Sequence, residues 1–357
     1  MIFESTSIKS LLENIEKDLG QGDNLSLKVC AFLSDLETFD LFSTDKIRRV
    51  KSEAKIDKNE FMIKFDYTLI GNLGETEKAS GIYFRHPNFD NVFLYVSFDP
   101  MFIFKRVIAN YFNRFRPKVS QVFLTSSQIK MLIADASNLL GTDALVSRVV
   151  VKQEYPNGEV DVKYKQKKVK YKQAFIEAEN ASSTVSSLNV FIKNLDAYIS
   201  KDGYFVLNKG TFKEFNSAIL NGAINLLESS KSIYSNRERR SENSFRSAPL
   251  TIRFEEDVFN SIDDITNFIN RVFDPIEKSF YSISHLNPYL QMSFTDFEDG
   301  SSFEIWVTKK NEVFIVPQFR ATFYSITKII RNVFGNFVEG NVIDSETNKI
   351  VEQNERV

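Results

Sequence analysis

The stretch Arg148–Asn180, RVVVKQEYPNGEVDVKYKQKKVKYKQAFIEAEN, constrains the fold more than any other part of the chain. Val149–Tyr155 reads as a strand, and Glu159–Tyr164 reads as a second, returning strand. Between them stands Pro-Asn-Gly, whose residues suit a tight turn. Two strands joined by so short a turn are antiparallel, so we expect a hairpin here.

The residues after this hairpin predict a third strand and then a helix. The third strand is expected from about Val169 to Glu179. A helix is expected from Ser182 or Ser183, because apolar residues recur there at helical spacing: Val185, Leu188, Phe191, Ile192 and Leu195. With the helix before the stretch and the compact hairpin after it, the predicted order is α-β-β-β-α-β.

Positive charge is concentrated in and before this stretch. From Met101 to Gln173 there are fourteen Lys or Arg and five Asp or Glu, about +9 in a chain whose net charge is −2. Lysines along a strand pair can follow a phosphate backbone, and each neutralised phosphate releases counterions. Tyr164 and Tyr171 lie among the lysines and could stack on unpaired bases. The alternative is a solvated edge strand that lysine protects from aggregation.

The candidate binding residues are basic and come from three segments. Two arginines lie on a helix predicted between Asp99 and Pro117, and three lie in the polar segment 235–248, SNRERRSENSFRSA. That segment is equally consistent with a flexible linker, and it is the principal domain boundary that the sequence predicts. The full set is Lys163, Lys165, Lys167, Lys168, Lys170, Lys172, Arg114, Arg116, Arg237, Arg239 and Arg240. They would contact nucleic acid or an acidic protein surface.

Carboxylates occur at the ends of the same predicted strands. Asp161 lies on the second strand, and Glu177 and Glu179 end the third. Residues two apart on a strand share a face, so Glu177 and Glu179 are expected on one side of the sheet. Three carboxylates gathered in this way could hold Mg²⁺ for phosphodiester hydrolysis. The alternative is that they balance neighbouring lysines.

This arrangement weakly resembles the active site of the PD-(D/E)xK nucleases. Their pattern is an acid followed by a strand that ends in an acid, any residue and lysine; the matching segments are GEVD at 158–161 and FIEAE at 175–179. The resemblance implies that Asp161 and Glu177 are metal ligands. Glu179 stands where the family has its lysine, so the match is incomplete at the third catalytic position.

Other catalytic chemistries lack the residues that they need. The chain has one cysteine, Cys30, and two histidines, His86 and His285, which argues against disulfide frameworks, zinc sites and Cys/His nucleophile pairs. Cys30 is expected to be a small buried hydrophobe and both histidines to be structural. Asp296, Glu298, Asp299 and Gly300 are expected to form a hairpin turn, because the spacing of a calcium loop is missing.

Length and patterning predict an α+β protein of more than one part. At 357 residues, two or three domains are expected. The predicted parts are an N-terminal α/β region with antiparallel strands and packed helices (1–235, divisible near 118–147), the basic linker 236–248, a C-terminal antiparallel sheet domain (249–339) of order β-α-β-β-β-β-α with helices on one face, and a polar tail (340–357). No segment approaches 18 uninterrupted apolar residues, so a soluble, cytoplasmic protein is expected.

Two functions follow from these patterns. The first is a non-enzymatic nucleic-acid-binding or complex-assembly protein that uses the lysine-rich sheet edge, including a subunit of a prokaryotic defence or mobile-element assembly. The second is a Mg²⁺-dependent nuclease that uses Asp161, Glu177 and Glu179. The direction in which Glu177 and Asp161 face distinguishes the two.

Overall fold

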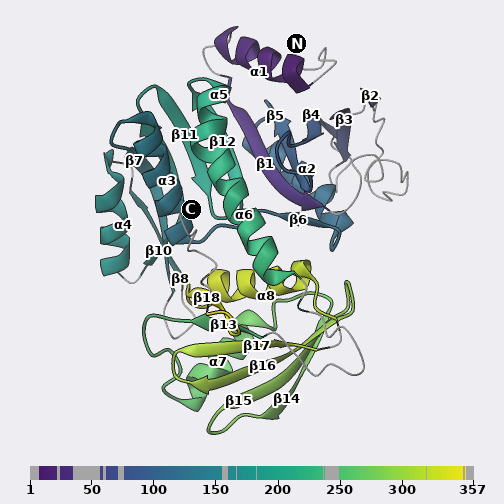
Figure 1. Cartoon of the computed structure of the whole chain (residues 1–357), viewed down its shortest axis with the longest axis vertical. Helices are drawn as coiled ribbons and strands as arrows, with labels where there is room; N and C mark the ends of the chain where they lie inside the picture. The colour runs from purple at the N-terminus through teal and green to yellow at the C-terminus, as the bar shows by residue number, and fades with distance from the viewer. Residues whose placement is uncertain are drawn as a thin grey trace. The chain divides into compact units, whose positions relative to one another are not determined.

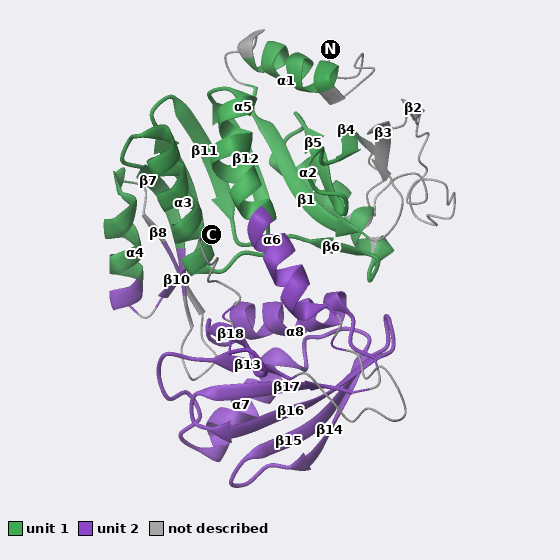
Figure 2. Ribbon diagram, in the orientation of Figure 1, with its two compact units in different colours: residues 1–150, 164–178, 185–224 green, residues 151–163, 179–184, 225–357 purple. Residues whose placement is uncertain are grey.

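The fold is α+β, with two antiparallel sheets and helices packed on them, as the sequence predicts (Figure 1). A computed structural model describes residues 8–21, 25–34, 57–58, 62–70, 76–154, 160–165, 167–181, 183–235, 237, 249–318, 320–348 and 350. The chain divides into two compact units (Figure 2): residues 1–150, 164–178 and 185–224 form the first, and residues 151–163, 179–184 and 225–357 form the second. Among the described residues, no helix is both long enough and apolar enough to span a membrane.

The first sheet has the strand order β2-β3-β4-β5-β1-β12-β11-β10-β7-β8, with β6 paired to β1 and β9 paired to β7. Antiparallel pairing links, for example, Cys30 to Tyr95 and Cys30 to Tyr204 on the two sides of β1. The strands are β1 (Leu27–Ser34), β2 (Asp57–Lys58), β3 (Met62–Ile70), β4 (Thr76–Arg85), β5 (Val92–Ser97), β6 (Val119–Gln121), β7 (Leu145–Glu154), β8 (Val160–Lys165), β9 (Val169–Lys170), β10 (Ser183–Ile192), β11 (Leu195–Ser200) and β12 (Tyr204–Lys209).

The helical segments before the polar segment are amphipathic or mostly buried. Thr125 caps α3 in a capping box with Gln128, and Thr211 caps the α5 helix by accepting a hydrogen bond from the Glu214 N–H at 3.1 Å. The segments are α1 (Ile8–Gln21), α2 (Met101–Asn110), a 3₁₀ turn (Phe112–Phe115), α3 (Ser126–Leu140), α4 (Tyr171–Asn180), α5 (Phe212–Phe215), a π-helical segment (Asn216–Leu220) and α6 (Asn221–Tyr234).

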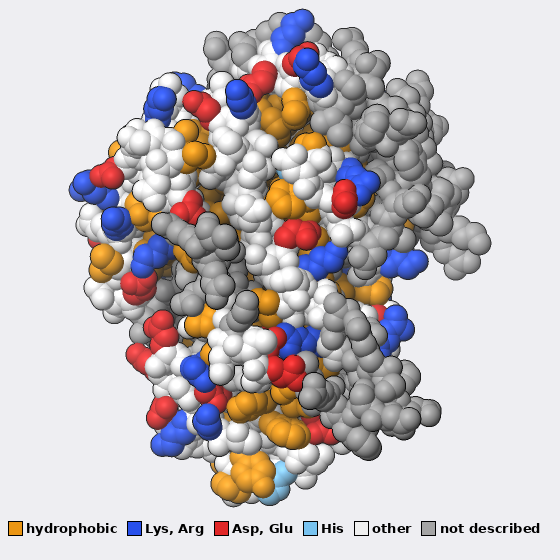
Figure 3. Space-filling model, in the orientation of Figure 1, with side chains coloured by type: hydrophobic (Ala, Val, Ile, Leu, Met, Phe, Trp, Pro, Cys, Tyr) orange, Lys and Arg blue, Asp and Glu red, His pale blue; other side chains and the backbone are white. Residues whose placement is uncertain are grey.

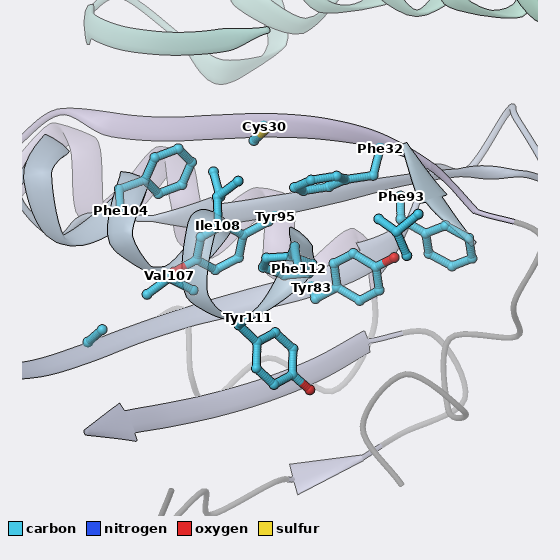
Figure 4. Packing of buried hydrophobic residues seen from close by; sticks show 12 residues of the cluster. Cys30, Phe32, Tyr83, Phe93, Tyr95, Phe104, Val107, Ile108, Tyr111 and Phe112 are labelled. Atoms are coloured by element: carbon cyan, nitrogen blue, oxygen red, sulfur yellow. The ribbon is translucent and has the colours of Figure 1, made fainter. Parts of the chain in front are cut away.

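The core of the first unit is aromatic, which accounts for part of the chain's 34 phenylalanines. Every residue of β1 and β5 is buried, so these central strands are covered on both faces. On one of those faces α2 and the following 3₁₀ turn contribute rings that stack on the sheet (Figure 4): Phe112 on Phe32, with centroids 4.7 Å apart, and Phe104 on Tyr95, 4.9 Å apart. Cys30 is buried in the same cluster, as expected.

The second sheet has the order β14-β15-β16-β17-β13-β18. Its strands are β13 (Leu250–Arg253), β14 (Ser279–His285), β15 (Leu290–Asp296), β16 (Ser301–Lys309), β17 (Glu312–Pro317) and β18 (Asn341–Asp344), with helices α7 (Ile262–Val272) and α8 (Phe323–Asn336). Burial alternates along β15 and β16, so one face is packed and the other is open. The predicted order β-α-β-β-β-β-α is confirmed, and β18 adds a strand within residues that were expected to be a polar tail.

Two neighbouring sequence predictions are wrong: the expected third strand is largely a helix, and the helix expected after it is a strand. Residues 171–180 form helix α4 where a strand was expected, because Tyr171, Ala174, Phe175 and Ala178 bury one helical face. Residues 183–192 form strand β10 where a helix was expected, because alternate positions are buried along most of its length. Its pairing with β11 is continuous from Ser187–Ser200 to Ile192–Leu195.

Candidate nucleic-acid interface

Four lysines lie on the surface where β9 ends and α4 begins. Lys167 and Lys168 precede β9, Lys170 ends it, and Lys172 is the second residue of α4. All four side chains are exposed. We call these residues the basic patch: Lys167, Lys168, Lys170 and Lys172. They belong to one compact unit and are spread over six consecutive residues.

The local fold explains why these lysines are on the surface. β9 pairs with the start of β7, with Val169 opposite Val146 and Lys170 opposite Leu145. The Tyr171 N–H donates to the Ala144 carbonyl at 3.2 Å, which fixes the start of α4 against the strand. The helix then buries Phe175 and its neighbours, so the residues between the buried positions point to solvent.

Few of the contacts of the basic patch neutralise its charge. Lys170 has one ion pair, 3.3 Å from Asp143, and both side chains are largely exposed, so the pair contributes little. The Lys168 ammonium lies 3.8 Å from the centroid of the Phe191 ring, and the Lys172 ammonium lies 5.9 Å from the centroid of Tyr171. Such cation–π contacts orient lysine without removing its charge.

The helix behind the patch adds to its positive potential. The N-terminus of α4 carries the positive end of the helix dipole, and the first turn has no acidic residue. Carboxylates are the groups that normally stabilise this end of a helix. Here Lys170 and Lys172 occupy those positions, so two ammonium groups lie beside the positive end of the helix dipole. A bound anion would relieve that repulsion.

The other predicted basic residues do not all join the patch. Lys163 is exposed on β8, within the residues assigned to the second unit. Arg116 is half-buried after the 3₁₀ turn. Lys165 and Arg114 lie on β8 and the 3₁₀ turn, but their side chains are outside the described set; Arg239 and Arg240 are outside it altogether. Tyr171, expected to stack on bases, is buried.

Arg237 corrects the expectation of an exposed arginine in the polar segment. Its side chain is only 5% exposed. The guanidinium donates to Asp344 at the end of β18, and its Nε donates to the Ile233 carbonyl at 2.6 Å. Burial opposes ionisation of Asp344, but hydrogen bonds from the Thr347 N–H and Arg237 outweigh it and lower the pKa of that carboxyl. Arg237 therefore holds the second unit together and is not a surface contact.

Glu177 and Glu179 of the nuclease hypothesis do not share one face of a strand, as was expected. Glu177 and Glu179 lie on helix α4, and residues two apart on a helix point to different sides. The Glu177 carboxylate instead accepts a hydrogen bond from Gln173 at 2.9 Å, one turn earlier. Asp161 is on β8, with its side chain outside the described set. Within the described part of the chain, no three His, Cys, Asp or Glu residues converge on a possible metal position.

A buried charged network, which the sequence did not reveal, lies in the second unit. The predicted turn at residues 296–300 is confirmed between β15 and β16. The ammonium of Lys328 on α8 lies 3.0 Å from carboxylate oxygens of both Asp296 and Glu298. Ser325, one turn before Lys328, donates to Asp296 at 3.0 Å or to Asp299 at 2.9 Å. The Lys328 ammonium lies between the two carboxylates, and its contacts with them join the hairpin to α8.

Glu298 owes its ionised state to that network. Burial alone would raise its pKa, but hydrogen bonds from Tyr324, Lys328 and Lys278 favour the carboxylate and lower the pKa to about 2. The Tyr324 hydroxyl donates at 2.8 Å, and Lys278 lies 3.1 Å away. The polar residues Ser325 and Lys328, three apart on an otherwise buried helix face, were the sequence signal for this cluster.

Both histidines are packed against neighbouring side chains. His86 is buried, and its Nδ1 accepts a hydrogen bond from the Asn88 N–H at 3.2 Å. Burial lowers the pKa of His86, and the neighbouring Asn221 side chain opposes this only in part. His285 packs on Tyr289, with ring centroids 4.5 Å apart. These contacts fit the structural roles expected from the sequence.

Comparison with known proteins identifies no relative. No protein-family model matches the chain, and no curated protein matches it in sequence. Among solved structures, DNA polymerase III subunit beta from Borrelia burgdorferi, in complex with a natural product, is similar at 8% identity over 93% of this chain and 90% of that chain, with a TM-score of 0.13. At this TM-score the similarity carries no information about fold or function.

Proposed function

We propose that the protein binds nucleic acid through the basic patch. The observation that carries this proposal is the exposure of four lysines within six consecutive residues, which have one acidic partner, the exposed Asp143, among the residues that the structure describes. Nucleic-acid backbones present regularly spaced phosphates, and lysine ammonium groups bind them as point charges. The N-terminus of α4 lies beside these lysines, and the positive end of its helix dipole attracts the same phosphates.

Phosphate contacts of this kind predict binding with little sequence preference. Tyr171 beside the patch is buried, and the half-buried ring of Phe191 is already in contact with the Lys168 ammonium, 3.8 Å from the ring centroid. Base recognition needs stacking surfaces or hydrogen bonds to base edges, whereas backbone contacts fix position without reading sequence. We therefore expect comparable affinities for oligonucleotides of different sequence.

Fluorescence anisotropy with labelled single-stranded DNA, single-stranded RNA and duplex DNA tests the proposal. The variant changes Lys167, Lys168, Lys170 and Lys172 to Gln together, which removes charge and keeps length. The matched control changes four exposed lysines elsewhere to Gln: Lys118, Lys209, Lys213 and Lys310. Binding by the wild type and the control, with strongly weakened binding by the patch variant, is expected. Equal affinity of the two variants would contradict the proposal.

A competition arm separates nucleic acid from an acidic protein as the partner. Polyglutamate carries the same sign of charge without phosphates. Displacement of the oligonucleotide only at a large excess of polyglutamate is expected if phosphate is recognised. Displacement at equal charge concentration would instead identify an acidic polypeptide as an equivalent ligand and contradict recognition of phosphate.

A further inference from the structure

The outer edge of the second sheet is a strand without the protection that sheet edges normally carry. β14 is the terminal strand of its sheet and, within the described residues, hydrogen-bonds only to β15. Its sequence, SFYSISH, contains no lysine, carboxylate or proline. Natural proteins guard exposed edges with such residues, with short strands or with bulges, because an open edge pairs with other strands. The bulge of β14 lies at its end, between Ile283 and His285.

The other described edges have these guards. β8, at one end of the first sheet, carries Lys163 and Lys165, and β2, at the other end, has only two residues. β18, the opposite edge of the second sheet, is four residues long, and its Ile343 is bridged by Ile350. β6 and β9, which lie off the main path of the first sheet, have only three and two residues, so β14 is the exception among the described edges.

Exposed apolar side chains gather around this edge. Of the eleven exposed large hydrophobic residues described, four come from residues 280–297: Phe280, Ile283, Tyr289 and Phe297. Phe280 is 59% exposed and Phe297 is 64% exposed. Figure 3 shows hydrophobic side chains grouped at the bottom of the view, over the end of the unit that carries β14 and β15. Such a grouping beside an open edge is typical of an interaction surface.

We propose that β14 pairs antiparallel with β14 of a second copy of this chain. Centred on Ser282, this register places Tyr281 of each copy opposite Ile283 of the other and Ser282 opposite itself. Aromatic residues opposite β-branched ones, and hydroxyls opposite hydroxyls, are favourable cross-strand pairs. The pairing would cover Ile283, which is 43% exposed in the single chain. Because the strand has no charged residue, self-pairing brings no like charges together.

The choice of a second copy over another ligand follows from this neutral, self-complementary sequence. A polyanion or a charged peptide would find no opposite charge on β14. The only flanking cation, Lys278, is engaged with Glu298 at 3.1 Å. In the proposed register Lys278 faces Leu286 of the other copy, so no repulsion arises at the ends either.

Sedimentation velocity of the full chain, from low-micromolar to sub-millimolar concentration, tests the pairing. Ser282→Lys places a lysine opposite its own copy at the centre of the proposed interface. Ser293→Lys is the matched control: Ser293 is the direct partner of Ser282 on β15, is also exposed and lies one strand inside the edge. The wild type is expected to dimerise. Ser282→Lys is expected to raise the dissociation constant of the dimer at least about fivefold, whereas Ser293→Lys is expected to leave it unchanged.

A charge-swap mixture gives a second readout. Ser282→Glu alone is expected to be as monomeric as Ser282→Lys, and mixing the two variants is expected to restore the dimer as a heterodimer. A wild type that stays monomeric at every concentration would overturn the proposal. A segment of another protein would then be the candidate partner of β14. A dimer that Ser282→Lys and Ser293→Lys weaken equally, or that neither weakens, would overturn it as well.

Discussion

Lys328 is the ion-pair partner of two largely buried carboxylates in the second unit, Asp296 and Glu298. Asp296 beside it has no exposed side-chain surface, so removing the ammonium leaves a buried carboxylate without its ion-pair partner. We predict that Lys328→Met lowers the free energy of unfolding by on the order of 3 kcal/mol. Urea denaturation measures this loss. Lys310→Met, at an exposed lysine, is the control and is expected to change stability little.

Glu298 gives a pH-dependent prediction. Its pKa is about 2 in the folded protein against 4.5 for the free group. A folded pKa below the unfolded one means that the carboxylate stabilises the fold above pH 4.5 and that this contribution is lost as the pH falls toward about 2. We predict that Glu298→Gln is less stable than the wild type at neutral pH by on the order of 2 kcal/mol. The difference should close over that pH range in denaturation experiments; a constant difference would contradict it.

Single residues also mark where sequence reasoning stops. The hairpin turn at Asp296–Gly300 is predicted from the local sequence, and the structure confirms it. The partner of that turn, Lys328, lies about thirty residues further along the chain, and the partner of Arg237, Asp344, is over one hundred residues away. A local pattern can mark a polar residue on a buried helix face, as it does at Lys328, but it does not identify the distant partner, because packing decides which residues meet.

At the scale of elements, Gly81 sets how closely β4 approaches the aromatic core. A Cβ at Gly81 would lie 2.3 Å from the ring of Tyr95, which is fully buried and cannot move aside cheaply. We predict that Gly81→Ala costs about 2 kcal/mol of stability through overpacking. Differential scanning calorimetry would show the lowered Tm. Gly335→Ala, at a glycine of α8 with open space around the added Cβ, should not lower it.

The exchanged helix and strand show why some elements could not be predicted from sequence. YKQAFIEAEN follows a short strand and has two acids near its end, yet Lys, Gln, Ala and Glu are good helix formers and the buried residues recur at helical spacing. STVSSLNVFI has apolar residues at both strand and helix spacings, and its pairing with β11 decides between the two. Strands β13 to β17 of the second sheet were predictable because their turns and alternation agree, whereas β18 was missed.

At the scale of the whole molecule, charge is distributed unevenly while the total is close to neutral. The chain carries 45 Lys or Arg and 47 Asp or Glu, and basic and acidic side chains are interspersed on the displayed face (Figure 3). The basic patch is a local feature on this mixed surface, so binding should be local and electrostatic. The sequence located its lysines correctly but placed them on a strand pair, whereas they lie around a short strand and a helix N-terminus.

The salt dependence of oligonucleotide binding tests this central claim most directly. Each lysine that neutralises a phosphate adds about 0.7 to the magnitude of the slope of log K against log salt concentration for single strands. We predict that replacing the four patch lysines by Gln reduces that magnitude by about 3, while the control quadruple variant keeps the wild-type slope. An identical slope in the patch variant and the wild type would contradict binding through Lys167, Lys168, Lys170 and Lys172.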